Sequence, residues 1–589
     1  MSSLSAKTNY GSVPSIDNES SNTTTDGAAG ECDGRRWVGE KRPTRQSAWT
    51  AAPLLLGLVF LATLLTTRPQ PFPTLLKSSM NDAAHDEDTA LFYEDQLLDH
   101  VDTSGSDEVW KHRYYKSTEY FRGPGSPIFL VVGGEGALNN GMLYPFVTQH
   151  LAKRFGAAVV QPEHRFYGPY QPIPFGEAST SQLLKLLTPE QAMQDMLRLV
   201  NVHMHEKGQD FEGCPPDRSD PDYCPLITIG ASYPGFLSAM FRTVYPDVVD
   251  AAYASSAPLL MYAQVSDSDA YYDIVTKAAE RSSPGCAHSV RTTLTEVRDM
   301  VLEAPSLADA AELVGVCTEG EMFPKSITSQ NDLADALVLM AVYGFANYDM
   351  GVYPPGPHTS MYKICQAFQD PELDSIDTLK WYFKSQIMAN YEEEYDCDMK
   401  SVHCNPDDEM AYVKEQYGEC FDLRPEMDDS PEPILSEFDG ISYDDGFSWN
   451  FQTCTDVIFL AGQSQTSMFV PKEATYEDLT KMCQDEFGTD VTPRPWELVD
   501  RWHFDDLVGD EVNASRILFT NGMQDMWSGG SYLEDLSDSV LALNFENGAH
   551  HSDLTHAGPS EKDTDDIREG HAKITEILGM WIGEIKEGK

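Results

Sequence analysis

Three residues that lie far apart in the sequence could together cleave an acyl bond: Ser232, Asp525 and His550. A serine hydroxyl is a weak nucleophile near neutral pH, so it needs a base within hydrogen-bond reach, and the base needs a carboxylate that orients it. Each of the three residues follows a short apolar run, and the order serine, aspartate, histidine is one in which such triads occur. We predict Ser232 as the nucleophile, Asp525 as the orienting carboxylate and His550 as the general base.

The segment around the serine, ITIGASYPGF, departs from the Gly-x-Ser-x-Gly signature of a sharp strand-to-helix turn. Gly230 supplies the small residue before Ser232, but Pro234 stands where the second glycine is expected. Proline suits the first turn of a helix, although it disfavours the helical conformation for Tyr233. We expect the turn to persist with altered geometry.

Two backbone N–H groups should stabilise the oxyanion that forms when the serine attacks. Tyr233, which follows the nucleophile, keeps its N–H. The second donor is expected in a glycine-rich loop after an early strand, and VVGGEGA at 131–137 fits, with Gly134 or Glu135 as the donor. By itself, Gly-Gly-Glu-Gly is more typical of a simple turn.

The elements that must position these residues are indicated by the apolar pattern. Continuous apolar runs, typical of strands in a sheet covered on both faces, occur at 127–132, 157–162, 225–230, 516–520 and 540–545. A helix follows the third run, and an amphipathic helix with Ile574 and Trp581 ends the chain. From about 262 to 445 helical segments and acidic loops replace the strands. The pattern predicts one α/β domain interrupted by a mostly helical insert. The order serine, aspartate, histidine, each after a strand, is that of an α/β-hydrolase fold.

A transmembrane helix is expected before this domain. The run at 48–66 holds 19 residues without a charge, enough to cross a bilayer. Basic residues such as Arg35 and Arg36 precede it, so the N-terminus should be cytoplasmic and the rest lumenal or extracellular, as in a single-pass type II protein. The predicted parts are a disordered cytoplasmic tail (1–47), the signal anchor (48–66), a stalk (67–90), the first part of the hydrolase domain (91–261), the helical cap (262–445) and the second part of the hydrolase domain (446–589).

The amino-acid composition limits the possible binding partners of the protein and the cellular compartment in which it works. The formal net charge of −53 argues against nucleic acid, whose phosphates need clustered Lys and Arg. The acidity fits either a solvated surface or work in an acidic compartment. Ten of the 11 cysteines follow the apolar run, an even number that suggests disulfides in an oxidising compartment. Cys-x-x-Cys pairs are absent, which argues against structural zinc, and Asn513-Ala-Ser515 is a glycosylation sequon.

Several separated stretches resemble a known family, the lysosomal serine peptidases that include prolyl carboxypeptidase and dipeptidyl peptidase II. They span roughly 93–585 and read LLDHVD (97–102), GGEG (133–136), PEHRFYG (162–168), GASYPG (230–235), YASSAP (253–258), TNGMQDMWSGG (520–530) and GAHHSDL (548–554). The family usually has Gly-Gly-Ser-Tyr-Gly-Gly at the serine and Gly-Ala-His-His-Leu-Asp-Leu at the histidine, so Ala231, Pro234 and Ser552 are departures. The resemblance makes His550, the first of the pair, catalytic, and it implies neither a cofactor nor a metal site.

The resemblance implies a serine exopeptidase that cleaves peptides next to proline, either as a carboxypeptidase or as a dipeptidyl peptidase, with the cap limiting access to chain ends. Tyr233, Met526 and Trp527 stand beside the predicted catalytic residues and could line a pocket for proline, although Trp527 could equally well pack in the core. Glu163, His164 and Arg165 are expected to form a buried ion pair or hydrogen-bond network, in preference to a direct catalytic role. The resemblance implies an endolysosomal, vacuolar or extracellular location, and the oligomeric state, a homodimer included, stays open. It also suggests the disulfides Cys286–Cys365, Cys317–Cys420 and Cys454–Cys483, with Cys214–Cys224 and Cys397–Cys404 as local extra pairs.

Two other functions remain open at this point. An esterase or lipase on the same fold would share the triad, although the Gly-Ala-His-His and Asn-Gly-x-x-Asp contexts favour the peptidase. A non-catalytic ectodomain on the same fold is the third alternative, and Pro234 is its main support.

Overall fold

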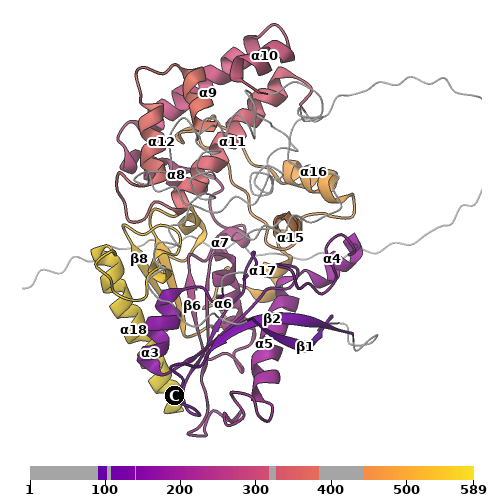
Figure 1. The fold of residues 1–589 in the computed structure, drawn as a ribbon, viewed down its shortest axis with the longest axis vertical. Coiled ribbons are helices and arrows are strands. Elements are labelled where there is room, and N and C mark those ends of the chain that lie inside the picture. Colours follow the sequence, from indigo (N-terminus) through magenta and orange to yellow (C-terminus); the bar gives the residue numbers. More distant parts are fainter. Residues whose placement is uncertain (1–89, 102–107, 139–140, 317–326, 384–442, 589) are drawn as a thin grey trace, which may run out of the picture. The chain divides into compact units, whose positions relative to one another are not determined.

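A computed structural model describes residues 90–101, 108–138, 141–316, 327–383 and 443–588 (Figure 1). The predicted cytoplasmic tail, the predicted membrane span and the stalk up to residue 89 lie outside these ranges. Within them, no helix combines the length and the apolar character that a bilayer span requires. The domain boundaries stay a prediction.

Eight strands form one sheet in the order β1-β2-β4-β3-β5-β6-β7-β8 (Figure 1). β1 pairs antiparallel with β2 and β2 with β4, and the remaining neighbours are parallel. The last two strands come from the C-terminal part of the chain, so the sheet unites segments on both sides of the helical insert. The strands are β1 (Leu91–Leu97), β2 (Val109–Ser117), β3 (Ile128–Val131), β4 (Ala158–Pro162), β5 (Leu226–Ala231), β6 (Ala251–Ser255), β7 (Ile517–Gly522) and β8 (Val540–Phe545).

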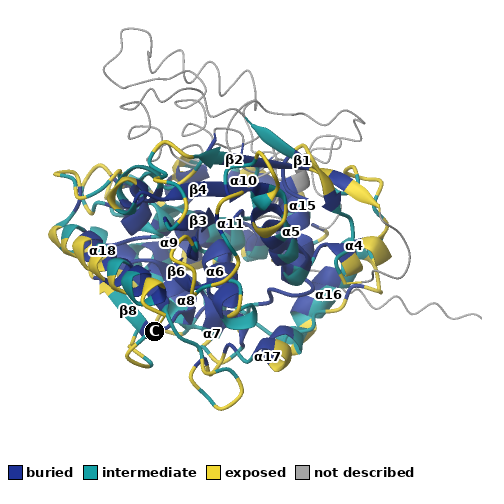
Figure 2. Ribbon diagram, turned by 90° about the horizontal axis from the view of Figure 1, so that it is seen from below, coloured by how far each residue is buried: buried dark blue, intermediate teal, exposed yellow. Residues whose placement is uncertain are grey.

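The central strands are buried on both faces. Every residue of β3, β4, β5 and β7 is buried, which explains why these strands read as continuous apolar runs. Alternate residues enter different cores: Phe129 and Val131 belong to one cluster, and Ile128 and Leu130 to another. Figure 2 shows the buried colour along β3 and β4.

Helices cover the two faces of the sheet. Helix α5 (Pro189–Asn201) and helix α6 (Tyr233–Val244) contribute Met193, Met196 and Phe236 to the cluster that contains Ile128. On the other face, the π-helix η1 (Phe146–Leu151) and helix α18 (Asp565–Lys586) contribute Phe146 and Trp581 to the cluster that contains Phe129. Other short helices are α3 (Ala152–Phe155), α4 (Thr180–Leu186), η2 (His203–His205), α17 (Glu497–Trp502), η4 (Met526–Gly530) and η5 (Ser552–Leu554).

The region predicted as a cap is helical where it is described. Its helices begin at capping serines or threonines in several cases, such as Ser306, Ser329 and Thr359, whose side chains accept a backbone N–H of the first turn. The helices from this region onward are α7 (Leu259–Tyr262), α8 (Ala270–Ser282), α9 (Cys286–Glu303), α10 (Leu307–Val314), α11 (Gln330–Met350), α12 (Ser360–Phe368), α15 (Tyr443–Thr453) and α16 (Tyr476–Phe487).

Three of the five suggested disulfides are confirmed. Cys286–Cys365 joins α9 to α12, Cys454–Cys483 joins the segment after α15 to α16, and Cys214–Cys224 closes a loop before β5. The suggested pairs Cys317–Cys420 and Cys397–Cys404 lie outside the described residues.

Candidate active site

Ser232 alone makes the turn between β5 and α6. The strand ends at Ala231 and the helix begins at Tyr233. Ser232 has φ 60° and ψ −130°, a backbone conformation that non-glycine residues rarely adopt. Its N–H donates to the carbonyl of Ser255 at 2.9 Å, which ties the turn to the end of β6. Such a strained turn is the geometry that presents a nucleophilic serine at the end of a strand.

The glycines on either side of the serine permit this turn. A Cβ on Gly230 would lie 2.1 Å from the carbonyl oxygen of Pro234, and one on Gly235 would lie 2.6 Å from that of Ser255. Pro234 is the second residue of α6, where no N–H is needed for the helix. The proline is therefore accommodated, and Tyr233 is helical despite the preference that the next residue imposes.

The predicted aspartate and histidine meet through a hydrogen bond. Asp525 follows β7, His550 follows β8, and His550 Nδ1 donates to Asp525 Oδ2 at 2.9 Å. The other carboxylate oxygen of Asp525 accepts the N–H of Trp527 at 3.1 Å. The Asp525 side chain is fully buried and that of His550 is 9% exposed. A neutral imidazole that is bonded in this way carries its proton on Nδ1 and keeps Nε2 as the base.

The loops that carry the three predicted residues are bonded to one another at the end of the sheet. Ser256, next to the Ser255 that holds the serine turn, accepts the N–H of His551 on its hydroxyl at 2.9 Å and donates its own N–H to Thr520 at 2.8 Å. Among the described hydrogen bonds, none joins Ser232 to His550. Such a bond often forms fully only when substrate is bound.

Asp553 ties together the strands beneath the histidine loop. Its carboxylate accepts the hydroxyls of Ser255 and Thr520, each at 2.7 Å, and also the phenol of Tyr253. The neighbouring Ser552 accepts the N–H of Ala549 at 2.9 Å. The sequence marks Ser552 only as a departure from the family pattern and does not mark Asp553, yet both residues shape the loop that carries His550.

The glycine-rich loop after β3 lies against the serine turn. A Cβ on Gly134 would lie 2.4 Å from Pro234 Cγ, so the loop contacts the first turn of α6 directly. The N–H of Tyr233 is the first of that helix and has no carbonyl of the helix to bond. Desolvation raises the pKa of the Glu135 carboxyl, while a backbone hydrogen bond and the charge of the nearby His550 oppose this effect. The three predicted oxyanion residues thus lie around the turn.

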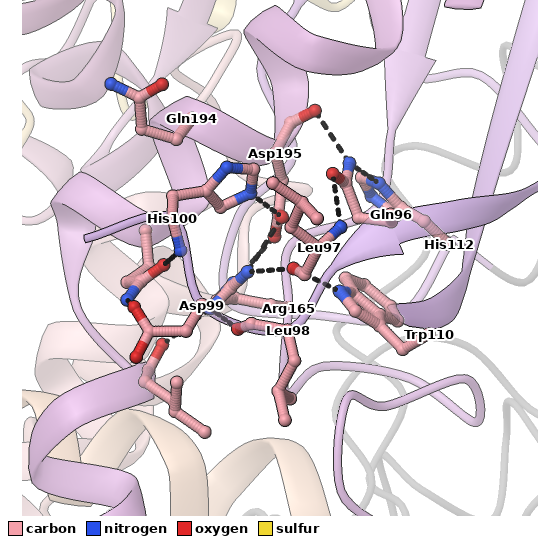
Figure 3. Close-up of polar contacts among 12 residues, drawn as sticks. Gln96, Leu97, Leu98, Asp99, His100, Trp110, His112, Arg165, Gln194 and Asp195 are labelled. Carbon is pink, nitrogen blue, oxygen red and sulfur yellow. Dashed lines mark hydrogen bonds and ion pairs between the residues drawn. The ribbon is translucent and has the colours of Figure 1, made fainter. Parts of the chain in front are cut away.

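The network predicted at Glu163, His164 and Arg165 is confirmed, since each of the three side chains is buried and hydrogen-bonded. Figure 3 shows the part of it around Arg165. The guanidinium of Arg165 binds Asp195 through two hydrogen bonds of 2.6 and 2.7 Å, and His100 bonds the same carboxylate at 2.7 Å. Burial alone would raise the pKa of Asp195, but Arg165 and His100 lower it to about 2. Burial lowers the pKa of His164 to about 4, so this ring is neutral near neutral pH.

The network reaches Tyr233, the residue next to the predicted nucleophile. His164 Nε2 lies 3.1 Å from the phenol oxygen of Tyr233, and Gln452 Nε2 donates to the same oxygen at 3.0 Å. The fully buried Tyr233 side chain therefore belongs to this polar network, whereas we had expected it beside a proline pocket.

The match to a family model decides the class of this protein. The model described as serine carboxypeptidase S28 matches residues 96–574. The chain belongs to this family, and the protein is a serine peptidase.

Several known proteins are similar in sequence to most of this chain. Lysosomal Pro-X carboxypeptidase of Mus musculus is 26% identical over 516 residues, covering 85% of this chain and 92% of that protein. Prolyl carboxy peptidase like protein 5 of Caenorhabditis elegans is 27% identical, covering 80% and 86%. Thymus-specific serine protease of Homo sapiens is 25% identical, covering 84% and 87%. An acylaminoacyl peptidase structure covers 30% of this chain and 25% of its own with a TM-score of 0.21, too low to support an argument. The sheet and the family together give an α/β-hydrolase-like fold.

An aromatic cluster lies beside the histidine of this serine peptidase. The ring of Trp527 lies 6.5 Å from that of His550, 5.1 Å from Tyr271 and 5.2 Å from Phe459. Met526 is buried next to it. Two of the three residues that we expected near a proline pocket are thus in the same turn after Asp525.

A hydrogen bond that the sequence did not predict joins the insert to the loop that carries Asp525. Asp349, the penultimate residue of α11, is fully buried and accepts the N–H of Met526 at 3.0 Å. Burial and the nearby charge of Asp525 raise its pKa well above the usual value for a carboxyl. No local signal marks Asp349, because a single aspartate near a helix end is common in acidic sequences. Among the described residues, no group of His, Cys, Asp and Glu side chains could hold a metal ion.

Proposed function

We propose that the protein is a serine exopeptidase in which Ser232, Asp525 and His550 form the catalytic triad. The observation that carries the proposal is the strained turn at Ser232 together with the 2.9 Å bond between His550 and Asp525 on neighbouring loops. The proposal is also supported by the chain order, since Ser232, Asp525 and His550 follow the C-terminal ends of β5, β7 and β8, which are parallel strands of one sheet. Membership of the S28 family supports the peptidase chemistry.

The proposed reaction uses only side chains and backbone N–H groups of this chain. His550 Nε2 takes the proton of the Ser232 hydroxyl as its oxygen attacks the peptide carbonyl, and Asp525 stabilises the charged imidazole. The N–H of Tyr233 and one from the loop at Gly134 and Glu135 bind the oxyanion. His550 then protonates the leaving amine. In the second half of the reaction His550 takes a proton from water, whose oxygen attacks the acyl-enzyme carbonyl, and it returns this proton to the Ser232 oxygen as the acid product leaves.

We infer a preference for proline before the cleaved bond. Several relatives are named Pro-X or prolyl carboxypeptidases. The cluster of Trp527, Tyr271 and Phe459 offers an aromatic surface beside His550, and a pyrrolidine ring suits such a surface. Removal of one C-terminal residue and release of an N-terminal dipeptide are both compatible with this site, and peptide substrates with either end blocked distinguish them.

We also propose a type II orientation in the membrane, with residues 48–66 as the anchor and the peptidase domain in the endolysosomal or vacuolar lumen or outside the cell. Three disulfides support an oxidising compartment. The relatives that are named lysosomal support the lumenal alternative.

A fluorophosphonate probe tests the triad. The full chain, expressed in membranes and extracted in detergent, is treated with the probe at pH 5 and pH 7, and the labelled peptide is mapped. Labelling of Ser232 is expected, and Ser232→Ala should abolish it and reduce turnover of Pro-X peptides by several orders of magnitude. A folded wild-type protein without labelling would refute the proposal. Ester hydrolysis without cleavage of any proline-containing peptide would favour an esterase instead.

A further inference from the structure

Helix α15 carries three buried polar residues on one face. Asp445, Ser448 and Gln452 are spaced three and four residues apart, which places them on the same side of a helix. Asp445 and Gln452 are fully buried and Ser448 is 3% exposed. Buried polar groups need partners, and all three find them in loops around the candidate active site.

Asp445 bonds two backbone N–H groups from different loops. Its Oδ2 accepts the N–H of Ala137 at 3.2 Å, and its Oδ1 accepts the N–H of Gly168 at 2.6 Å. Ala137 belongs to the glycine-rich loop that carries Gly134 and Glu135. Gly168 ends the loop that begins with Glu163. One carboxylate thus joins the oxyanion loop to the loop of the buried network.

Ser448 and Gln452, the other two residues of this helix face, bond residues of the same loops and the side chain of Tyr233. The hydroxyl of Ser448 donates to the carbonyl of Phe166 at 2.9 Å. Gln452 donates to the phenol of Tyr233 at 3.0 Å and accepts the phenol of Tyr167. The helix therefore contacts the oxyanion loop, the loop beside it and the side chain next to the nucleophile.

The oxyanion loop has a second carboxylate at its far end. Glu163 Oε1 accepts the N–H of Leu138 at 3.0 Å, and the same carboxylate pairs with Arg113. A Cβ on Gly168 would lie 2.4 Å from Glu163 Oε1, so the backbone passes directly over this group. Consecutive N–H groups at 137 and 138 are thus fixed by two carboxylates, while Gly134 rests against Pro234.

We propose that Asp445 is a positioning residue for the oxyanion hole. It does not touch the substrate; it fixes the loop whose N–H group at Gly134 or Glu135 would bind the oxyanion. This inference rests on the proposed function. A carboxylate is required because two N–H donors need two acceptor oxygens, and an asparagine would turn its NH₂ toward one of them.

The test compares Asp445→Asn with a matched substitution, Asp250→Asn, in the full-length, detergent-extracted enzyme. Asp250 is also buried, at 3% exposure, and its Oδ2 accepts the N–H of Leu226 at 2.8 Å, but it lies at the opposite end of β5 from Ser232. Active sites are titrated with the fluorophosphonate, so that kcat is expressed per labelled Ser232. Each enzyme is then measured for kcat, KM, melting temperature and inhibition by a Pro-containing peptide aldehyde, whose adduct places an oxyanion in the hole.

Asp445→Asn should lower kcat about 10- to 100-fold, because a shift of a single oxyanion donor has effects of this size. Affinity for the aldehyde should fall in parallel while KM stays near the wild-type value. Asp250→Asn should lower the melting temperature and leave kcat per site unchanged. Asp445→Glu keeps both acceptor oxygens and serves as the second variant if the asparagine enzyme does not fold; it should show the same pattern with a smaller loss.

Wild-type kcat and aldehyde affinity in every folded Asp445 variant would overturn the inference, even if their melting temperatures fall. This outcome is distinct from failure of the proposed function, in which wild-type Ser232 would not be labelled at all.

Discussion

The close contact between Gly134 and Pro234 predicts how a larger side chain at position 134 would affect catalysis. A Cβ added by Gly134→Ala would lie 2.4 Å from Pro234 Cγ and 3.0 Å from Cδ. Carbon atoms in contact need roughly 3.5 Å, so the loop would have to move by about 1 Å. The proline ring cannot move away easily because it is part of the first turn of α6.

A displacement of about 1 Å in a catalytic group costs on the order of 100-fold in rate, or about 2.7 kcal/mol of transition-state stabilisation. We therefore expect Gly134→Ala to lower kcat roughly 100-fold with a small effect on KM. Pro234→Gly removes the atoms that clash. In that background, Gly134→Ala should cost less than about tenfold, so the two substitutions are strongly non-additive.

The assay is kcat per titrated Ser232 for the wild type, both single variants and the double variant, on one Pro-X peptide. Pro234→Gly alone is the control for loss of the ring. A glycine also increases the entropy of the unfolded chain, which lowers the free energy of unfolding by about 0.4–1 kcal/mol. If Gly134→Ala lowers kcat equally with and without the proline, the clash is not the cause, and the account of the loop's position against α6 is wrong.

Two further predictions concern the triad and the pH dependence of stability. Asp525→Asn should lower kcat by about 10⁴-fold, because the amide cannot accept from both His550 and Trp527; a loss below tenfold would remove Asp525 from the triad. Desolvation raises the pKa of Glu486 to about 7 from 4.5, so the stability linked to its proton is full below pH 4.5 and is lost as the pH rises through 7. Glu486→Gln should then raise the free energy of unfolding by roughly 1–3 kcal/mol at pH 8 and hardly at pH 4, measured by urea denaturation; an equal effect at both pH values would contradict this.

The sequence was most informative where burial is complete. The five predicted strands, β3, β4, β5, β7 and β8, all belong to the parallel part of the sheet. In four of them, β3, β4, β5 and β7, every residue is buried, so apolar residues follow one another without alternation. The helices of the insert and the final amphipathic helix could be predicted from the helical spacing of their apolar residues.

Three strands escaped detection for identifiable reasons. β1 and β2 form the antiparallel edge and contain charged residues such as Glu94 and Lys111, so they lack an apolar run. β6 reads Ala-Ala-Tyr-Ala-Ser, and its small residues give a weak strand signal although every one of them is buried.

Some residues of the candidate site could be predicted from sequence motifs, and others are recognised only from their contacts in the folded protein. Ser232, Asp525 and His550 could be found because each follows a strand signal and the chain order is diagnostic. Asp445 and Asp349 could not, because each accepts backbone N–H groups of segments that lie far away in the sequence. Asp445 is one of many acidic residues in a strongly acidic chain, and nothing local distinguishes it from a solvated one.

The departures from the family pattern bear on whether the protein is a catalyst. Pro234 replaces a glycine, yet its ring fills the space beside Gly134, and the close approach to Ser255 is made by Gly235 one position later. Ser552 replaces an apolar residue, yet its hydroxyl accepts the N–H of Ala549 in the histidine loop. A chain that had lost selection for activity would be expected to relax these loops, because strain such as that at Ser232 persists only where the surroundings enforce it. Both substitutions instead add contacts that fix the serine turn and the histidine loop, so they favour a working peptidase over a non-catalytic ectodomain.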